Sequence, residues 1–356
     1  MTNTFFPHRS AGRRRARSLA LAATVLLPAL LVTGCTSEVV EPAAAPNATP
    51  WDSSYVAPPE MTLSPLRGVS VPAGSLLNPA LSAKIDNHEA ARPQVGLERA
   101  DIVFEELVEG GITRYVGVWQ SDVPELVGPV RSIRPMDPDI MSPFGGIAAY
   151  SGGAQAFLNL MRSTPLVSVV FDTDTTGLFT RSSEKSAPHN VLLNATETMS
   201  RNASLAPPAQ QFAYAPSLAA ASAVIDGTPT SAINTRFSTV RWPSWNWNAE
   251  SATFLRQQEG APDLDSSGNQ LAATNVVVLR VDIDNTYGNI PKTTMIGSGE
   301  ASVSAGGKSV AATWTKDSPT AAIRLVDANG VTVHLAPGNT WIELVPGGTG
   351  SVELVP

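Results

Sequence analysis

The feature that most constrains the fold is a glycine pair, Gly110-Gly111, which separates two runs of mixed apolar and polar residues within 101–120. Paired glycines readily adopt the positive φ angles of a two-residue hairpin turn. Such a turn places Glu105 opposite Val116. Because side chains alternate between the two faces of a strand, this register predicts a hairpin with three charged residues on one face: Glu105, Glu109 and Arg114.

Composition favours a protein rich in strands and loops. At 356 residues the chain is long enough for about two domains of roughly 100 to 200 residues. Apolar residues make up 43%, enough for hydrophobic cores, and charged residues only 15%. The 29 prolines and 27 glycines favour short strands and turns over a helical bundle. The apolar run 275–283 is typical of a buried strand, and further strands are expected at 310–315, 322–326, 331–335 and 340–344.

The N-terminal 34 residues have the parts of an export signal. Arginines precede an apolar run, 19–32, which is shorter than the roughly 20 residues that span a bilayer. The following Leu31-Val32-Thr33-Gly34-Cys35 resembles the bacterial lipobox, in which the cysteine is acylated and becomes the N-terminus. We expect an exported protein that lipid on Cys35 holds on the outer face of the cytoplasmic membrane. Arg13-Arg14 leaves the export route open between the general secretory and twin-arginine pathways.

The charge of the mature chain argues against nucleic acid as a partner. The leader contains five arginines and no acid, so its removal leaves 19 basic and 31 acidic residues, a net charge of −12. A field of this sign repels phosphate backbones. The expected partners are the membrane, through the lipid anchor, and an envelope ligand or a protein.

A second charged segment lies at 127–135, where Gly128, Pro129 and Pro135 fix a loop that carries Arg131 and Arg134. Guanidinium groups bind carboxylates and phosphates through paired hydrogen bonds. The alternative is that these arginines form structural ion pairs with acids of the same region. Farther on, a glycine pair at 152–153 precedes an expected helix at 154–161, and such a helix start favours anions.

Several motifs together resemble the YerB-like lipoprotein family, whose two parts are the DUF3048 N- and C-terminal domains of unknown function. The first half carries Asp86-Asn87-His88, Arg92-Pro93-Gln94, Glu109-Gly110-Gly111-Ile112-Thr113-Arg114, Gly128-Pro129-Val130-Arg131-Ser132, Arg181 and Ala187-Pro188-His189-Asn190. The second half carries Arg256, Asn275-Val276-Val277-Val278, Thr313-Trp314 and Pro337-Gly338 with Thr340-Trp341-Ile342.

The resemblance implies an α/β (α+β) fold, a layered mixed-sheet domain such as a ββα sandwich, with a β-rich C-terminal region. It implies no established activity. The expected organisation is a lipoprotein signal peptide (1–34), a disordered tether (35–75), an N-terminal α/β domain (76–200), a linker with a helix (201–230), a β-rich C-terminal domain (231–346) and a tail (347–356).

The predicted ligand-binding surface collects polar residues and glycines of the first domain: Asp86, Asn87, His88, Glu105, Glu109, Arg114, Arg131, Arg134, Gly152, Gly153, Arg181, His189 and Asn190. A non-catalytic binding or assembly role in the cell envelope is favoured, with an anionic or carbohydrate-derived ligand or a protein partner. The alternative is an envelope hydrolase or transferase that uses Glu105 or Glu109 with His189. No catalytic residue, metal ligand or cofactor is assigned, because the sequence contains no HExxH, Walker A or GxSxG motif.

Two shorter patterns have competing interpretations. Asp172-Thr-Asp174-Thr-Thr176 follows an apolar run, as in phosphatases of the haloacid dehalogenase type, but no downstream lysine and acidic pair completes that motif. Trp242, Trp245 and Trp247 suit either strand packing or stacking on sugar rings, and packing is favoured.

Overall fold

The computed structural model describes residues 54–356 and is built around one large mixed sheet of eleven strands. In spatial order these are β11 (Thr228–Pro229), β21 (Lys308–Lys316), β20 (Gly297–Ala305), β17 (Asn275–Val281), β23 (Thr340–Pro346), β4 (Ile102–Leu107), β5 (Thr113–Trp119), β3 (Leu81–Asp86), β7 (Ile147–Tyr150) and β8 (Val167–Val170), with β22 (Arg324–Val326) paired to β21.

The two halves of the sequence meet inside this sheet. Strand β23 from the C-terminal half pairs in parallel with both β17 and β4, so that Ile342 lies between Val277 and Phe104. All seven residues of β23 are buried. The sequence of a parallel strand that is covered on both faces is a nearly continuous run of apolar residues. The buried strand predicted at 275–283 is confirmed as β17.

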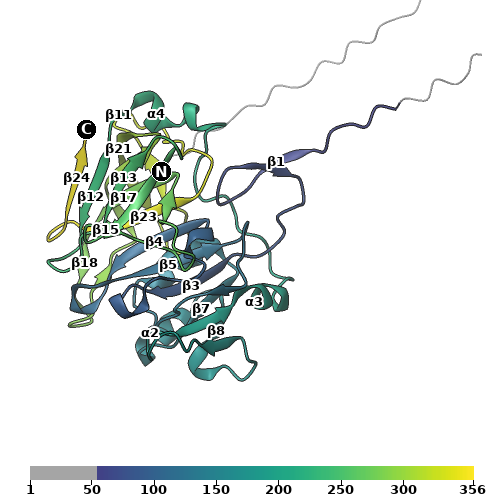
Figure 1. Ribbon diagram of the computed structural model, residues 1–356, viewed down its shortest axis with the longest axis vertical. Helices are drawn as coiled ribbons and strands as arrows, with labels where there is room; N and C mark the ends of the chain where they lie inside the picture. Colours follow the sequence, from purple (N-terminus) through teal and green to yellow (C-terminus); the bar gives the residue numbers. More distant parts are fainter. Residues whose placement is uncertain (1–53) are drawn as a thin grey trace, which may run out of the picture. The chain divides into compact units, whose positions relative to one another are not determined.

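A second sheet of six strands packs on one face of the large sheet (Figure 1). Its order is β15 (Ala261–Pro262), β14 (Thr253–Gln258), β13 (Ser244–Asn248), β12 (Ala232–Arg236) and β24 (Ser351–Val355), with β16 (Ala272–Ala273) paired to β14. A small sheet of β6 (Leu126–Val127), β10 (Val191–Asn194) and β9 (Phe179–Arg181) contributes to the same core, as does α3 (Ala195–Arg201).

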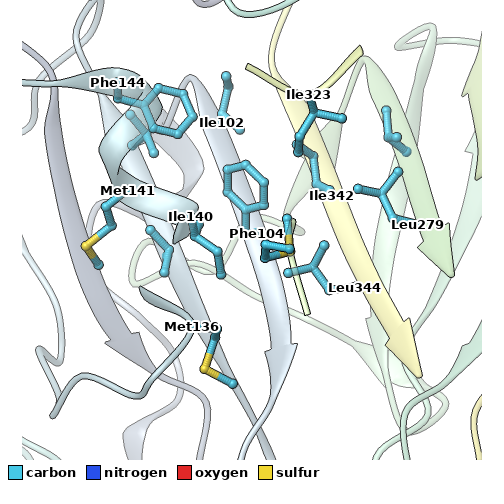
Figure 2. Packing of buried hydrophobic residues seen from close by; sticks show 14 of the residues in the cluster. Ile102, Phe104, Met136, Ile140, Met141, Phe144, Leu279, Ile323, Ile342 and Leu344 are labelled. Atoms are coloured by element: carbon cyan, nitrogen blue, oxygen red, sulfur yellow. The ribbon is translucent and has the colours of Figure 1, made fainter. Parts of the chain in front are cut away.

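Short helices and loops cover the opposite face. The helices α1 (Asp137–Met141) and α2 (Gln155–Arg162), with the 3-10 turn η4 (Ser142–Phe144), pack there. Figure 2 shows Ile140 and Phe144 of this layer near Phe104 of β4 and Ile342 of β23. The result is a helical layer, the large sheet and a second sheet, which confirms the predicted α+β class with a β-rich C-terminal region.

The remaining elements are short connections. They are β1 (Met61–Leu63) paired with β2 (Ser70–Pro72), β18 (Ile283–Asp284) paired with β19 (Lys292–Thr293), α4 (Ser222–Asp226), and the 3-10 turns η1 (Glu89–Ala91), η2 (Leu97–Arg99), η3 (Glu109–Gly111), η5 (Phe171–Thr173) and η6 (Leu218–Ala220).

The hairpin at 101–120 forms, but the predicted register is wrong by one residue. Glu105 pairs with Tyr115 and Glu106 with Arg114. The reason is the loop: Val108 N–H donates to Ile112 O, and three residues rather than two lie between them. A slip of one residue moves side chains to the other face, so Arg114 shares a face with Glu106 and not with Glu105.

Two segments that were expected to lack structure contain strands. Within the expected tether, β1 and β2 form a hairpin, and between them Leu66 is fully buried and its carbonyl accepts a hydrogen bond from Tyr214 Oη. Within the expected tail, β24 pairs along its length with β12. The predicted strand at 331–335 is wrong, because only isolated bridges occur there. The leader and Cys35 lie outside the described residues.

Candidate functional site

The carboxyl ends of several strands meet at one edge of the large sheet. Strands β3, β7 and β8 are parallel, so the residues that follow them lie along the same edge. Asp86 ends β3, Ser151 follows β7, and η5 with Asp172 follows β8. In open α/β sheets, ligands bind outside the carboxyl ends of strands, where neighbouring connections run in opposite directions. This edge is the candidate functional site.

A loop segment is inserted between the ends of β3 and β7. Arg131 N–H donates to Lys84 O at 2.9 Å, and Ser151 N–H donates to Arg131 O at 2.9 Å. Asp86 N–H in turn donates to the carbonyl of Pro129. The segment 129–133 thus acts as a short extra strand, and it brings Arg131 to the carboxyl edge as a fixed element of the sheet.

Asp86 is the centre of the edge cluster. Its carboxylate is 1% exposed, and Oδ2 lies 2.6 Å from Nδ1 of His189 and 3.1 Å from Nε of Arg131. Oδ1 accepts the backbone N–H of His88, whose ring stacks on His189 at 4.4 Å. Since a carboxylate can only accept, Nδ1 of His189 carries the proton and donates. Nε2 of His189 has no hydrogen-bond partner among residues 54–356.

Arg131 is held by one atom and leaves the rest of its guanidinium group available. Nε lies 3.1 Å from the Asp86 carboxylate and forms an ion pair with it, but the N–H does not point at the oxygen closely enough for a hydrogen bond. The side chain is 20% exposed. Within residues 54–356, neither terminal nitrogen of Arg131 has a hydrogen-bond partner. The hydroxyl of Ser132, within the inserted segment, lies 3.3 Å from that of Ser151, which follows β7. The free fork of two donors on Arg131 suits a phosphate or carboxylate group.

A second group at the same edge is satisfied internally. Arg134 donates to both carboxylate oxygens of Glu109, with Nε to Oε2 at 2.7 Å, and Arg114 lies 3.5 Å from Glu109. Arg114 also donates to Ser132 O at 2.7 Å. Burial opposes ionisation of Glu109, but the hydrogen bond and charge of Arg134, with Arg114, outweigh it and lower the pKa of Glu109 to about 2. Burial and the charge of Arg134 lower the pKa of Arg114 to about 10.

Glu105 does not lie at the edge. It is fully buried between the two sheets, where Arg256 of β14 donates to it at 2.5 Å. The same guanidinium group pairs with Asp263 at 2.9 Å and Glu343 at 2.8 Å, and the rings of Tyr115, Trp245 and Trp341 surround it. The predicted grouping of Glu105 with Arg114 is therefore wrong, and the one-residue change of hairpin register is the cause.

Other residues of the predicted surface hold the loops in place. Asn87 is buried and donates to Thr113 Oγ1 at 2.8 Å. Arg181 donates to Asn190 at 2.7 Å, and the Asn190 amide donates to two carbonyls of the 182–190 loop. A Cβ on Gly152 would lie 1.9 Å from Asp172 Oδ2, so the glycine allows a close approach, and a Cβ on Gly153 would meet Ile133.

Sequence reasoning missed two buried charged groups. Lys84 pairs with Glu106 and, at 2.8 Å, with Asp137, and all three are fully buried. Burial lowers the pKa of Lys84 to about 8, although Asp137 opposes this shift. In the Arg256 group, burial and the neighbouring Glu105 raise the pKa of Glu343 to about 8. The available signal was a lone charge within an apolar strand, as at Lys84 and Glu343.

The two shorter motifs lie in a turn and in a strand. Asp174 accepts from the backbone N–H of Thr176 and Phe179 and closes its own loop. Trp245 is fully buried and packs edge-on against Trp341. Within residues 54–356, no group of three or more His, Cys, Asp or Glu side chains is arranged to hold a metal ion.

The comparisons with known proteins agree with the motifs. Two models of one family match the chain: the DUF3048 N-terminal domain, a domain of unknown function, over residues 68–207, and the DUF3048 C-terminal domain over residues 233–342. The chain belongs to this family. It is 36% identical over 130 residues to the "Putative lipoprotein YerB" of Bacillus subtilis, an alignment that spans 36% of this chain and 38% of the relative.

The crystal structure of YerB from Bacillus subtilis has the same fold. It matches with a TM-score of 0.71 at 22% identity, and the match covers 82% of this chain and 99% of that one. Among the described residues, no helix is both long and apolar enough to cross a membrane.

Proposed function

We propose that this protein is an exported lipoprotein, anchored by lipid on Cys35 to the outer face of the cytoplasmic membrane, that binds an anionic envelope component at the carboxyl edge. The homology to a lipoprotein and the lipobox-like sequence before Cys35 support the anchor. We also propose that residues 76–200 and 231–346 form the two domains of the mature protein.

The observation that carries the binding proposal is the pair of terminal nitrogens on Arg131. The Arg131 side chain is 20% exposed, so terminal donors that the fold does not use are open to a ligand. Arg131 is fixed by its backbone and by Asp86, yet its fork has no hydrogen-bond partner within the described part of the chain. This fork would hold a phosphate or a carboxylate group of a wall polymer or sugar acid, next to His189, which contacts the same Asp86 oxygen as Arg131.

Calorimetric titration of the purified mature protein tests the binding proposal. The probes are inorganic phosphate, a polyol phosphate polymer and soluble wall fragments that carry carboxylates. Saturable binding of at least one probe is expected, with at least a tenfold loss in Arg131→Met. Arg99→Met is the matched control, because Arg99 is 42% exposed and pairs with Asp122 away from Asp86. Equal affinity of Arg131→Met and the wild type for every probe would contradict the proposal.

The anchor has a separate test. Radiolabelled fatty acid fed to cells is expected to label the wild type and not Cys35→Ser, which should be released from the membrane fraction. A labelled Cys35→Ser protein would contradict the proposal.

A second candidate function is an envelope hydrolase or transferase. The contact of His189 with Asp86 at 2.6 Å favours it, because a carboxylate that orients a histidine is the arrangement of a general base. Glu105 and Glu109 are poor partners for such a base. Glu105 is buried against Arg256, and Glu109, with a pKa of about 2, is ionised at neutral pH and cannot act as a general acid. Turnover of phosphoesters or wall fragments that His189→Gln abolishes would favour this candidate.

A further inference from the structure

The six-stranded sheet ends at β24, and one edge of that strand is open. Strand β24 pairs with β12 and has no second strand partner among residues 54–356. Figure 1 shows it as the outermost strand beside β12. An open edge exposes backbone N–H and C=O groups that can pair with another extended chain. Proteins commonly use such an edge to bind peptide segments.

The side chains of β24 indicate that its sheet is incomplete. Leu354 pairs with Ile233, which is fully buried, so both side chains point toward the large sheet. Leu354 is nevertheless 37% exposed. A leucine on the inward face remains this exposed because no strand of residues 54–356 lies alongside the free edge of β24 to cover it.

A groove lies beside Leu354, between β24 and the large sheet. It has a volume of about 450 Å³, and its lining includes Val278 of β17, Ser302 of β20, and Val352 and Leu354 of β24. Beyond the groove lies β21. The two β21 residues that pair with groove-lining residues of β20 are small and exposed: Ala311 pairs with Ser302, and Thr313 pairs with Glu300. The large sheet therefore extends beyond β24 with small side chains on this face, which leaves space for one more strand.

We propose that this groove binds an extended, basic segment of a partner protein, which adds a strand to β24. Alternate apolar side chains of the segment would enter the groove against Val278 and Leu354. The side chains between them would lie on the outer face of the sheet, where the exposed Glu353 pairs with Asn234. The groove itself is lined by one arginine and one glutamate, Arg280 and Glu300, and Arg280 donates to the carbonyls of Gly347 and Gly350. On the outer face, Glu353 favours lysine or arginine at the position opposite it in the added strand.

A second copy of this chain fits the open edge less well. Full antiparallel pairing of two β24 strands would be centred on Glu353 and would place the two glutamates directly opposite each other. Like charges in that position destabilise a strand pair. The groove is separate from the Arg131 edge, so this inference does not depend on the proposed anion binding.

A randomised library of displayed nonapeptides, panned against the full mature chain, tests the inference. Enriched peptides are expected to alternate apolar residues with lysine or arginine. A synthetic copy should bind the wild type and lose affinity at least tenfold when alternate backbone nitrogens are methylated, because a β-strand partner needs those donors. Absence of enrichment, or equal binding of the methylated peptide, would overturn the inference.

Two variants locate the binding site. Leu354→Glu and Ser302→Trp are each expected to weaken binding of the synthetic peptide at least tenfold, the first by placing an ionised group where an apolar side chain of the peptide packs and the second by filling the groove. Val331→Glu is the control, because Val331 is 59% exposed and does not line the groove. Circular dichroism of each variant verifies folding. Unchanged affinity in both groove variants would contradict the inference, and so would a wild-type dimer in sedimentation that Leu354→Glu dissociates, because a second copy would then occupy the groove.

Discussion

Arg256 and Arg131 both contact carboxylates of the large sheet, but the protein satisfies them to different degrees. Arg256 is fully buried, meets three acidic side chains and is surrounded by aromatic rings. Arg131 is partly exposed and meets one carboxylate through Nε. A guanidinium group whose donors are all used serves the fold, because removing it leaves buried charges unpaired. A guanidinium group with unused donors can be removed with little loss of stability, and its free donors remain available to a ligand.

The largest expected effect is on stability at Arg256. Arg256→Met leaves Glu105, Glu343 and Asp263 without their shared cation, and it should lower the free energy of unfolding by about 3–5 kcal/mol. Chemical denaturation measures this. Arg324→Met is the control, because its pair with Asp317 is about two-thirds exposed and should contribute less than about 1 kcal/mol. Similar losses in both variants would show that Arg256 contributes no more to stability than an exposed arginine.

The next effect is a dependence on pH from Glu343. Its pKa is raised to about 8 by burial and by Glu105, so the native state keeps a proton that the unfolded chain releases near its ordinary pKa of 4.5. The stabilising contribution is complete below pH 4.5 and is lost as pH rises through 8. For one proton the slope is at most about 1.4 kcal/mol per pH unit.

Glu343→Gln tests this dependence, because the amide oxygen can still accept from Trp245 Nε1, which lies 2.7 Å from Glu343 Oε1. The stability of the wild type relative to Glu343→Gln should fall between pH 5 and pH 7.5 in denaturant titrations. The pKa of Glu109 is lowered from 4.5 to about 2, and that of Lys84 from 10.5 to about 8. Both groups therefore titrate mainly outside this window. A constant difference between the two proteins would contradict the assignment.

A smaller loss is expected at Gly152, where the edge cluster has no space for a side chain. A methyl group there would meet Asp172 Oδ2 at 1.9 Å and should cost about 1–3 kcal/mol in Gly152→Ala. Asp172→Ala removes the obstructing carboxylate. The double variant should therefore regain part of the lost melting temperature in calorimetry. If it is no more stable than Gly152→Ala alone, the contact is not the cause.

The smallest expected effect on stability is at Arg131. Arg131→Met should change the free energy of unfolding by less than about 1 kcal/mol, because Arg131 is partly exposed and Asp86 keeps its contacts with His189 and the backbone N–H of His88. The same variant should lose binding of the anionic probes. A loss of several kcal/mol in denaturation would place Arg131 with Arg256, as a residue that serves the fold.

Much of the fold could be predicted from local patterns. The strands β17, β21 and β23, the helix α2 and the hairpin at 101–120 follow from apolar runs and glycine positions. The family followed from motifs such as Asp86-Asn87-His88. The division between edge and core could not be predicted, because it depends on whether the Gly110-Gly111 loop contains two residues or three. Glycine permits both.

The sequence by itself determined the strand-rich class, the family and the residues that carry charge. Only the tertiary structure decided which charges meet. Arg256 is 151 residues from Glu105 along the chain, and His189 is 103 residues from Asp86. Such pairs form because two sheets pack together and because a loop is inserted between strand ends. Side-chain patterns along one strand record which face is buried, but they do not record which distant residue covers it.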